Sequence, residues 1–129
     1  EYDGKLRTRA VHLKSGETII TDAPTDNKGR GESFSPTDLT TCALGSCILT
    51  IMGIVAERRG IEMQGTRSEI TKIMTENPRK ISKIIIHIFF PLSLSYIDRK
   101  ALEKTAYKCP VHHSLHKDID KEIIFHYPN

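Results

Sequence analysis

The chain has 129 residues, of which 27% are charged and 38% are hydrophobic, and its formal net charge is +3. These values are ordinary for a soluble protein with one hydrophobic core, so we expect a single domain over residues 1–129. Acids and bases are mixed along the chain and there is no tryptophan. No aromatic residue is interleaved with a basic run, so no nucleic-acid partner is expected. Three cysteines are an odd number in a chain that needs no disulfide framework, which favours free thiols in the cytoplasm.

Two strands are predicted near the N-terminus, over 7–13 and 17–21, and the turn between them contains a glycine. Residues 22–34 follow as a loop, because proline, asparagine and glycine punctuate them. The loop carries Arg30 between two glycines, which let the backbone bend and bring the guanidinium close to another group. A solvated loop arginine is the alternative interpretation.

A long helix is predicted over 35–59, with no charged residue in 39–56. Ser35 is its expected cap and Gly60 its expected stop. Threonines and glycines inside the segment argue against a membrane span, and its position argues against a signal peptide, so we expect no membrane partner. The helix is instead expected to be buried at the centre of a globular unit or a dimer. Small residues would let another element approach closely: Ala43, Gly45, Ser46 and Gly53.

The second half of the chain predicts two strands, two helices and a closing strand. The two strands are expected over 61–74 and 81–90. A helix with a serine cap is expected over 95–108, followed by a short helix capped by Cys109. The closing strand is expected over 119–127. Because strands and helices come in groups, the fold class is α+β with mainly antiparallel pairing.

The strand over 81–90 is the strongest in the sequence and predicts a central antiparallel strand with one wholly buried face. The residues of that face are Ile84, Ile86, Ile88 and Phe90. His87 lies on the other face and is expected to be a core or interface histidine rather than a metal ligand. In the helix over 95–108, Ile97, Ala101 and Leu102 are expected to share a face.

Two cysteines stand where a thiol could carry chemistry. Cys109 is predicted at a helix start, where the dipole and the free N–H groups favour a thiolate. Cys47 lies inside an apolar helix, where a thiolate is disfavoured unless a cation is nearby. A reactive Cys47 therefore requires a positive partner, with Asp38 as the candidate carboxylate that orients it. The candidate partners upstream are Arg30, Arg9 and Arg7.

Two such cysteines suggest peroxide chemistry. A thiolate attacks the peroxide oxygen and becomes a sulfenic acid, with which a second thiol condenses to a disulfide. A reductant then restores both thiols by exchange. Two buried structural cysteines are the alternative.

Three stretches of the sequence resemble the OsmC/Ohr family, the osmotically inducible and organic hydroperoxide resistance proteins. They are Ser35-Pro36-x-Asp38-Leu39, Ala43-Leu44-Gly45-Ser46-Cys47 and Cys109-Pro110-Val111-His112-His113-Ser114-Leu115. The resemblance covers the long helix, the last third of the chain and the order of elements between them. It implies an OsmC-like fold, in which antiparallel sheets wrap around a long central helix in an intertwined homodimer.

The resemblance also implies a thiol-dependent peroxidase that reduces organic, lipid-like hydroperoxides in defence against oxidative stress. Cys47 would be the peroxide-attacking cysteine and Cys109 the resolving one, and a dithiol of the lipoyl type would be the reductant. No cofactor and no metal are expected. Thr37 stands where the best-known peroxidase members carry a glutamate, while Asp38 matches the acidic position of the broader OsmC-like branch. Arg30 is near the expected place of the family's arginine but is not aligned with it.

Two rival functions remain open. A zinc site is one, because a cysteine and three histidines lie within eight residues. These residues are Cys109, His112, His113 and His116, with Cys42 as a further ligand. The other is an OsmC-like binding protein that holds a hydrophobic or thiol ligand with little turnover, motivated by Thr37. Outside the zinc alternative, Cys42 is expected to be structural, on another side of the helix from Cys47.

Overall fold

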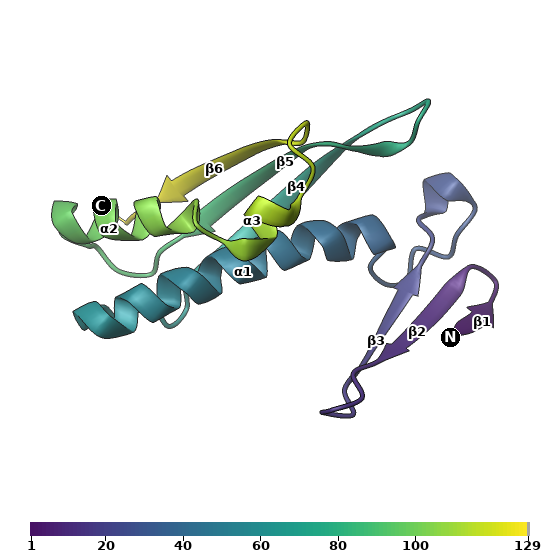
Figure 1. Ribbon diagram of the computed structural model, residues 1–129, viewed down its shortest axis with the longest axis horizontal. Coiled ribbons are helices and arrows are strands. Elements are labelled where there is room, and N and C mark those ends of the chain that lie inside the picture. The colour runs from purple at the N-terminus through teal and green to yellow at the C-terminus, as the bar shows by residue number, and fades with distance from the viewer. Residues whose placement is uncertain (129) are drawn as a thin grey trace. The chain divides into compact units, whose positions relative to one another are not determined.

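The structure is a computed structural model that describes residues 1–128. Backbone contacts divide the chain into two compact units, Glu1–Thr40 and Thr41–Asn129, and each is considered by itself. The class is α+β, with two three-stranded sheets and one long helix, as predicted (Figure 1). The expectation of a single domain over 1–129 stays a prediction.

The N-terminal unit is built on an antiparallel sheet in the order β1-β2-β3. Its strands are β1 (Tyr2–Gly4), β2 (Arg7–Val11) and β3 (Thr18–Asp22). The predicted hairpin between β2 and β3 is confirmed. β1 was not predicted, because three residues are too few to show an alternating pattern.

The loop that follows β3 is shorter than predicted and partly ordered. It contains a single turn of 3-10 helix, η1 (Thr25–Asn27). The predicted loop over 22–34 included Asp22, but this residue ends β3, directly opposite Arg7 of β2. The charged pair across the two strands explains why the strand extends to a residue that usually marks a turn.

The long helix α1 (Pro36–Arg59) begins and ends within a residue of the predicted bounds. At its end Gly60 has a φ of +68°, the left-handed conformation expected of a helix stop. The N–H groups of Gly60 and Ile61 donate to the carbonyls of Glu57 and Ala56, at 3.3 and 2.9 Å. These two bonds satisfy carbonyls that would otherwise be left without partners at the helix end.

The second sheet, in the order β4-β5-β6, belongs to the C-terminal unit. Its strands are β4 (Arg67–Thr75), β5 (Lys80–Phe89) and β6 (Asp120–His126). β4 begins later than predicted, because residues 61–66 form a turn closed by a bond from the Thr66 N–H to the Met63 carbonyl. β5 pairs antiparallel with β4 but parallel with β6, so the expectation of antiparallel sheets is wrong for the closing strand. Helices between β5 and β6 return the chain to the starting end of the sheet, which allows parallel pairing.

The two helices between β5 and β6 start where the sequence predicts. They are α2 (Tyr96–Ala106) and α3 (Pro110–Ser114), capped by Ser95 and Cys109. The inward face of α2 is formed by Leu102 and Ala106, which are fully buried. Ile97 is 71% exposed, so its predicted place on that face is wrong.

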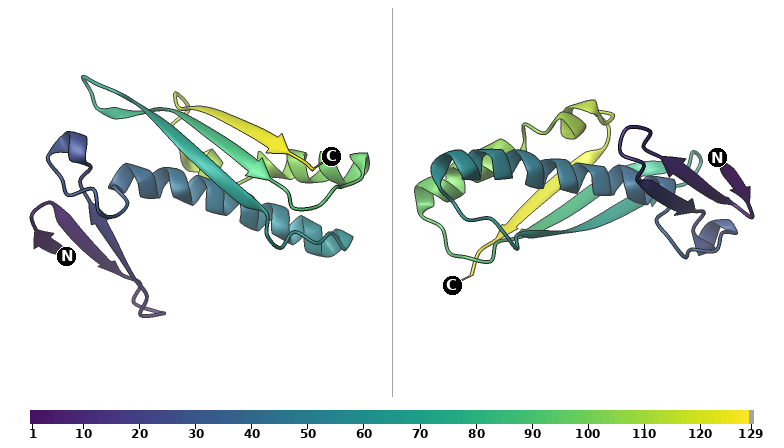
Figure 2. Two further views of the ribbon diagram at one scale, coloured as in Figure 1. Left: turned by 180° about the vertical axis from the view of Figure 1, so that it is seen from behind. Right: turned by 90° about the horizontal axis from the view of Figure 1, so that it is seen from below.

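One face of the second sheet packs against the helices and forms the core (Figure 2). The predicted apolar face of β5 is confirmed, since Ile84, Ile86 and Ile88 are 0% exposed. They pack with α1 residues that are equally buried, namely Leu44, Ile48 and Met52. His87 points to the opposite, half-exposed face, where its Nδ1 lies 2.8 Å from Nε2 of His126. It is therefore not a core histidine.

The small residues of α1 let a strand approach, as predicted, at one position. A Cβ atom built on Gly45 would lie 2.3 Å from Cδ1 of Ile70, which is closer than two carbon atoms can come. A Cβ on Gly53 would meet nothing within 4 Å. Gly45 thus fixes how closely α1 lies against β4.

By length and composition α1 could also cross a membrane. The core helix of a soluble protein satisfies the same criteria, and the inward face of α1 is buried against the sheet.

Candidate active site

The structure brings the two predicted chemical cysteines together inside the C-terminal unit. Cys47 lies on α1, is half-buried and packs against the core. Cys109 caps α3 and is 0% exposed. Both are free thiols, and they lie close enough for the Cys47 side chain to help raise the pKa of Cys109. Residues distant in sequence therefore form a thiol pair.

The Cys109 thiol is held by the first turn of α3. Its Sγ accepts a hydrogen bond from the His112 backbone N–H at 3.4 Å. Burial, followed by the hydrogen bond with Cys47, raises the pKa of Cys109, while the backbone N–H groups of His112 and Val111 act in the opposite direction. The thiolate character predicted for Cys109 is therefore wrong for the reduced protein, because desolvation outweighs the N–H groups of a five-residue helix.

This difference in surroundings distinguishes the two thiols chemically. Cys47 is partly open to solvent, so a small molecule can reach it more readily than it can reach Cys109. Cys109 is a protonated thiol that already lies close to the Cys47 side chain. An oxidised Cys47 would have a partner for disulfide formation without a large movement of the chain.

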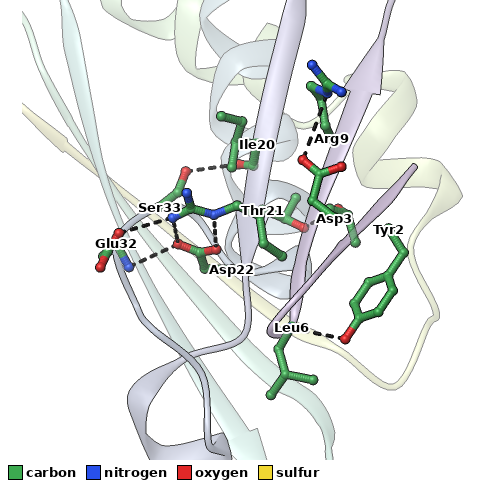
Figure 3. A network of polar contacts seen from close by, with 11 residues as sticks. Tyr2, Asp3, Leu6, Arg9, Ile20, Thr21, Asp22, Glu32 and Ser33 are labelled. Atoms are coloured by element: carbon green, nitrogen blue, oxygen red, sulfur yellow. Dashed lines mark hydrogen bonds and ion pairs between the residues drawn. The ribbon is translucent and has the colours of Figure 1, made fainter.

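The candidate arginines belong to the N-terminal unit, and Arg7 is fully engaged there. Its Nε and Nη2 donate to the two carboxylate oxygens of Asp22 at 2.7 and 2.8 Å. Nη2 also donates to Glu32 at 3.1 Å. Figure 3 shows Asp22 and Glu32 within this polar network.

Arg9 is also paired, whereas Arg30 is not. Arg9 donates to Glu1 at 3.1 Å and lies 3.9 Å from Asp3. Within residues 1–128 the side chain of Arg30 forms no hydrogen bond or ion pair, although its charge contributes to the low pKa of Asp22 after the larger effect of Arg7. Of the three candidates, Arg30 is the arginine that remains available for an anion.

Asp38 contributes to the cap of α1. Its Oδ2 accepts a hydrogen bond from the Ser35 N–H at 2.9 Å, and Ser35 Oγ accepts one from the Asp38 N–H at 3.0 Å. Thr37 Oγ1 lies 3.2 Å from the same Ser35 hydroxyl. The Ser35-Pro36-x-Asp38 motif thus has a structural role, which is to cap the start of α1 by two reciprocal hydrogen bonds. The role of Asp38 as a carboxylate that orients an arginine stays a prediction.

Cys42 lies apart from the thiol pair, in an open depression of about 430 Å³ beside α1. The depression is lined by Cys42, Ser46, Leu49, Thr50, Ser68 and Ile70. Among residues 1–128 there is no group of three or more cysteine, histidine or carboxylate side chains that could hold a metal ion. The geometry therefore gives the zinc alternative no support.

Asp22, a carboxylate that is 0% exposed, was not predicted from the sequence as a site residue. Its position after an apolar strand and before Ala-Pro suggested a loop. The pairing of Asp22 with Arg7 could have been predicted, because the position of the hairpin turn places the two residues opposite each other on β2 and β3.

Comparisons with known proteins agree on one family. The OsmC-like protein family model matches residues 29–123. The solved structure of a protein from Psychrobacter arcticus 273-4, provisionally assigned to osmotic stress and detoxification responses, is 48% identical with a TM-score of 0.95, covering 98% of this chain and 92% of that one. A comparison with curated protein sequences gave no match.

Two more distant structures share the fold. The organic hydroperoxide resistance protein OsmC of Legionella pneumophila is 19% identical with a TM-score of 0.64, covering 93% of this chain and 96% of that one. An organic hydroperoxide resistance protein of Elizabethkingia anophelis is 12% identical with a TM-score of 0.69, covering 95% and 94%. Because the family model spans most of the chain and a solved relative is nearly half identical, the protein belongs to the OsmC/Ohr family of OsmC-like proteins.

Proposed function

We propose that the protein is a thiol-dependent peroxidase that reduces organic, lipid-like hydroperoxides. Membership of the family suggests a function related to peroxide or stress. The proximity of the half-buried Cys47 and the buried Cys109 supports the thiol-peroxidase mechanism in particular. A pair of free thiols close together is what a two-cysteine reduction requires.

The proposed cycle has three steps. The Cys47 thiolate attacks the outer oxygen of the hydroperoxide, the O–O bond breaks, and the organic fragment leaves as an alcohol after it takes a proton. Cys109 then attacks the resulting sulfenic acid, so that an S–S bond forms and water leaves. A dithiol, of the lipoyl type by the family resemblance, reduces the disulfide with two electrons and becomes a disulfide itself.

Arg30 is the proposed cation that stabilises the Cys47 thiolate, and Asp38 the carboxylate that orients it. Arg7 and Arg9 form ion pairs with carboxylates, whereas Arg30 forms none within residues 1–128, which supports this choice. An attacking thiolate in an apolar helix needs such a charge.

We also propose a homodimer. The hairpin of the N-terminal unit exposes several large apolar side chains that are neighbours along β2, β3 and the turn between them. A second copy could cover them, because clustered exposed apolar residues favour an interface. They include Val11, Leu13, Ile19 and Ile20, which are 52%, 93%, 51% and 41% exposed. Light scattering after size-exclusion chromatography tests the proposal, and a mass of one chain at micromolar concentration would refute it.

The test of the peroxidase proposal is peptide mapping by mass spectrometry after brief exposure to cumene hydroperoxide or to hydrogen peroxide. A Cys47–Cys109 disulfide that forms faster with the organic peroxide is expected. Cys42→Ser is the matched control and should form the same disulfide at the same rate. Thiols that stay reduced under excess organic peroxide would refute the proposal.

A ligand-binding protein without turnover is the second candidate. The open depression beside α1 favours it, because its wall is largely apolar and a third thiol, Cys42, lies on it. Saturable binding of a fatty acid, together with thiols that resist peroxide, would support binding in place of catalysis.

A further inference from the structure

A buried carboxylate in the N-terminal unit has no part in the proposed cycle. Asp22 is 0% exposed, and burial of an ionised carboxylate is costly unless it is paired and hydrogen-bonded. The Arg7 guanidinium supplies the counter-charge in a two-point fork. A charge buried at this cost in a small sheet calls for an explanation beyond the pairing of β2 with β3.

The second partner of the Asp22 carboxylate, after Arg7, indicates what the carboxylate holds. Its Oδ2 accepts a hydrogen bond from the Glu32 backbone N–H at 3.2 Å, and its own backbone N–H donates to the Phe34 carbonyl at 3.0 Å. The next residue, Ala23, accepts from the Gly31 N–H at 3.1 Å. The end of β3 therefore holds the segment that directly follows Arg30 at three points, namely Gly31, Glu32 and Phe34.

The glycines beside Arg30 are packed in the same way. A Cβ atom on Gly29 would lie 1.7 Å from the Ala23 carbonyl oxygen, so no side chain fits there. Gly31 has a φ of +62°, and a Cβ on it would lie 2.8 Å from Cγ2 of Thr25. The sequence predicted that these glycines let the backbone bend, and the structure shows them packed against Ala23 and Thr25, next to the end of β3. Arg30 thus lies on a closely packed turn, and its charge is near enough to Asp22 to help lower the pKa of that carboxylate.

We infer that Asp22 is a positioning residue, which acts with Arg7 to hold the turn that presents Arg30. The carboxylate bridges the Arg7 side chain and the Glu32 backbone, so that the turn is tied to the sheet on the side where the chain leaves Arg30. This inference rests on the proposed function, in which Arg30 stabilises the Cys47 thiolate. A guanidinium fixed in advance stabilises an anion better than a mobile one, because it loses less freedom at the moment of reaction.

Two measurements on the full chain separate the positioning role from the role of Arg30. Hydrogen exchange by mass spectrometry reports the order of residues 29–34, and stopped-flow kinetics with cumene hydroperoxide report the rate of Cys47 oxidation. Asp22→Asn should raise exchange in residues 29–34 and lower the rate about tenfold. Arg30→Gln should leave exchange unchanged and lower the rate about a hundredfold.

The double variant carries the decisive comparison. If Asp22 acts through Arg30, Asp22→Asn added to Arg30→Gln causes no further loss of rate. A full additional tenfold loss would mean that Asp22 acts on stability alone and would overturn the inference. An unchanged exchange of residues 29–34 in Asp22→Asn would overturn it as well.

Two further variants keep the test interpretable. Asp3→Asn removes a carboxylate from the same sheet but from the side of Arg9, and should change neither measurement. Arg7→Lys keeps the charge, loses the fork, and should show a weaker form of the Asp22→Asn effect if Asp22→Asn itself fails to fold. If Arg30→Gln alone leaves the rate unchanged, the proposed role of Arg30 fails even where the loop measurement supports positioning.

Discussion

The two units of the chain bury opposite kinds of residue. In residues 1–40, all of which the structure describes, the buried residues are Thr21, Asp22 and Ser35. In the C-terminal unit the buried residues are almost all apolar, and many side chains of α1, β5 and α2 are 0% exposed. The N-terminal unit is therefore organised by polar contacts and the C-terminal unit by a hydrophobic core.

This difference teaches where stability and chemistry originate. A 40-residue unit that buries no large apolar side chain lacks the main favourable contribution to folding. Its polar network specifies a shape, and covering its exposed hydrophobes by another surface would supply the missing burial. The apolar unit folds around its own core and holds the thiol pair, which gains a fixed geometry from close packing.

The largest expected effect concerns the thiol pair of the apolar unit. Cys47→Ser should lower the rate of organic hydroperoxide reduction by at least about a thousandfold, because the hydroxyl is a far weaker nucleophile than a thiolate. Cys109→Ser should allow one oxidation of Cys47 but block turnover. The measurement is consumption of cumene hydroperoxide with a dithiol reductant, and activity retained in Cys47→Ser would place the chemistry elsewhere.

Truncation of buried and exposed isoleucines tests the contrast in burial directly. Ile86→Ala should lower the free energy of unfolding by about 3 kcal/mol, because it leaves a cavity in the core. Ile19→Ala, at a site 51% exposed, should change it by less than about 0.5 kcal/mol within one chain. Urea unfolding measures both. A loss for Ile19→Ala that grows as protein concentration rises would show that β3 contributes through assembly, because only the wild type would gain the full stability of association.

Acid should affect the polar unit first. The Arg7 hydrogen bond holds the pKa of Asp22 below its ordinary value of 3.8. The stability contributed by this carboxylate is therefore fully present above about pH 3.9 and is lost as the pH falls through the lower folded value. Hydrogen exchange in residues 1–40 should rise in that range before exchange in β5 does. In Asp22→Asn this pH dependence should disappear, and simultaneous loss in both units would contradict the contrast.

A small effect is also expected from the helix caps, one of which lies in each unit. Ser35→Ala should cost about 1 kcal/mol, because the Asp38 N–H loses its acceptor at the start of α1. Ser95→Ala at the start of α2 removes the same bond to Asp98 and is the matched comparison. Thermal unfolding of both variants measures the difference. Equal shifts would mean that the cap in the polar unit is as firmly formed as the cap in the apolar unit.

The sequence predicted local features well where one physical signal dominated. The bounds of α1, both serine caps and the apolar face of β5 follow from hydroxyl caps, a terminal glycine and β-branched residues at period two. The parallel pairing of β6 did not follow, because the periodicity of a strand carries no information on the direction of its neighbour.

The candidate site was predictable in its residues but not in its energetics. The pairing of Cys47 with Cys109 came from the family resemblance rather than from spacing. A helix cap indicated a thiolate at Cys109, yet burial, which depends on the whole fold, raises its pKa. Asp22 was missed because its partners, Arg7 and the Glu32 amide, come together only through the hairpin and the loop.

The bond from the His112 amide to the Cys109 sulfur gives the protein a built-in spectroscopic reporter. When the Cys109 sulfur forms a disulfide, it becomes a weaker hydrogen-bond acceptor. The first turn of α3 then loses part of its cap. The amide proton resonance of His112 should therefore shift with the redox state of the thiol pair. Nuclear magnetic resonance could then follow oxidation and reduction at one backbone position, without a label on either cysteine.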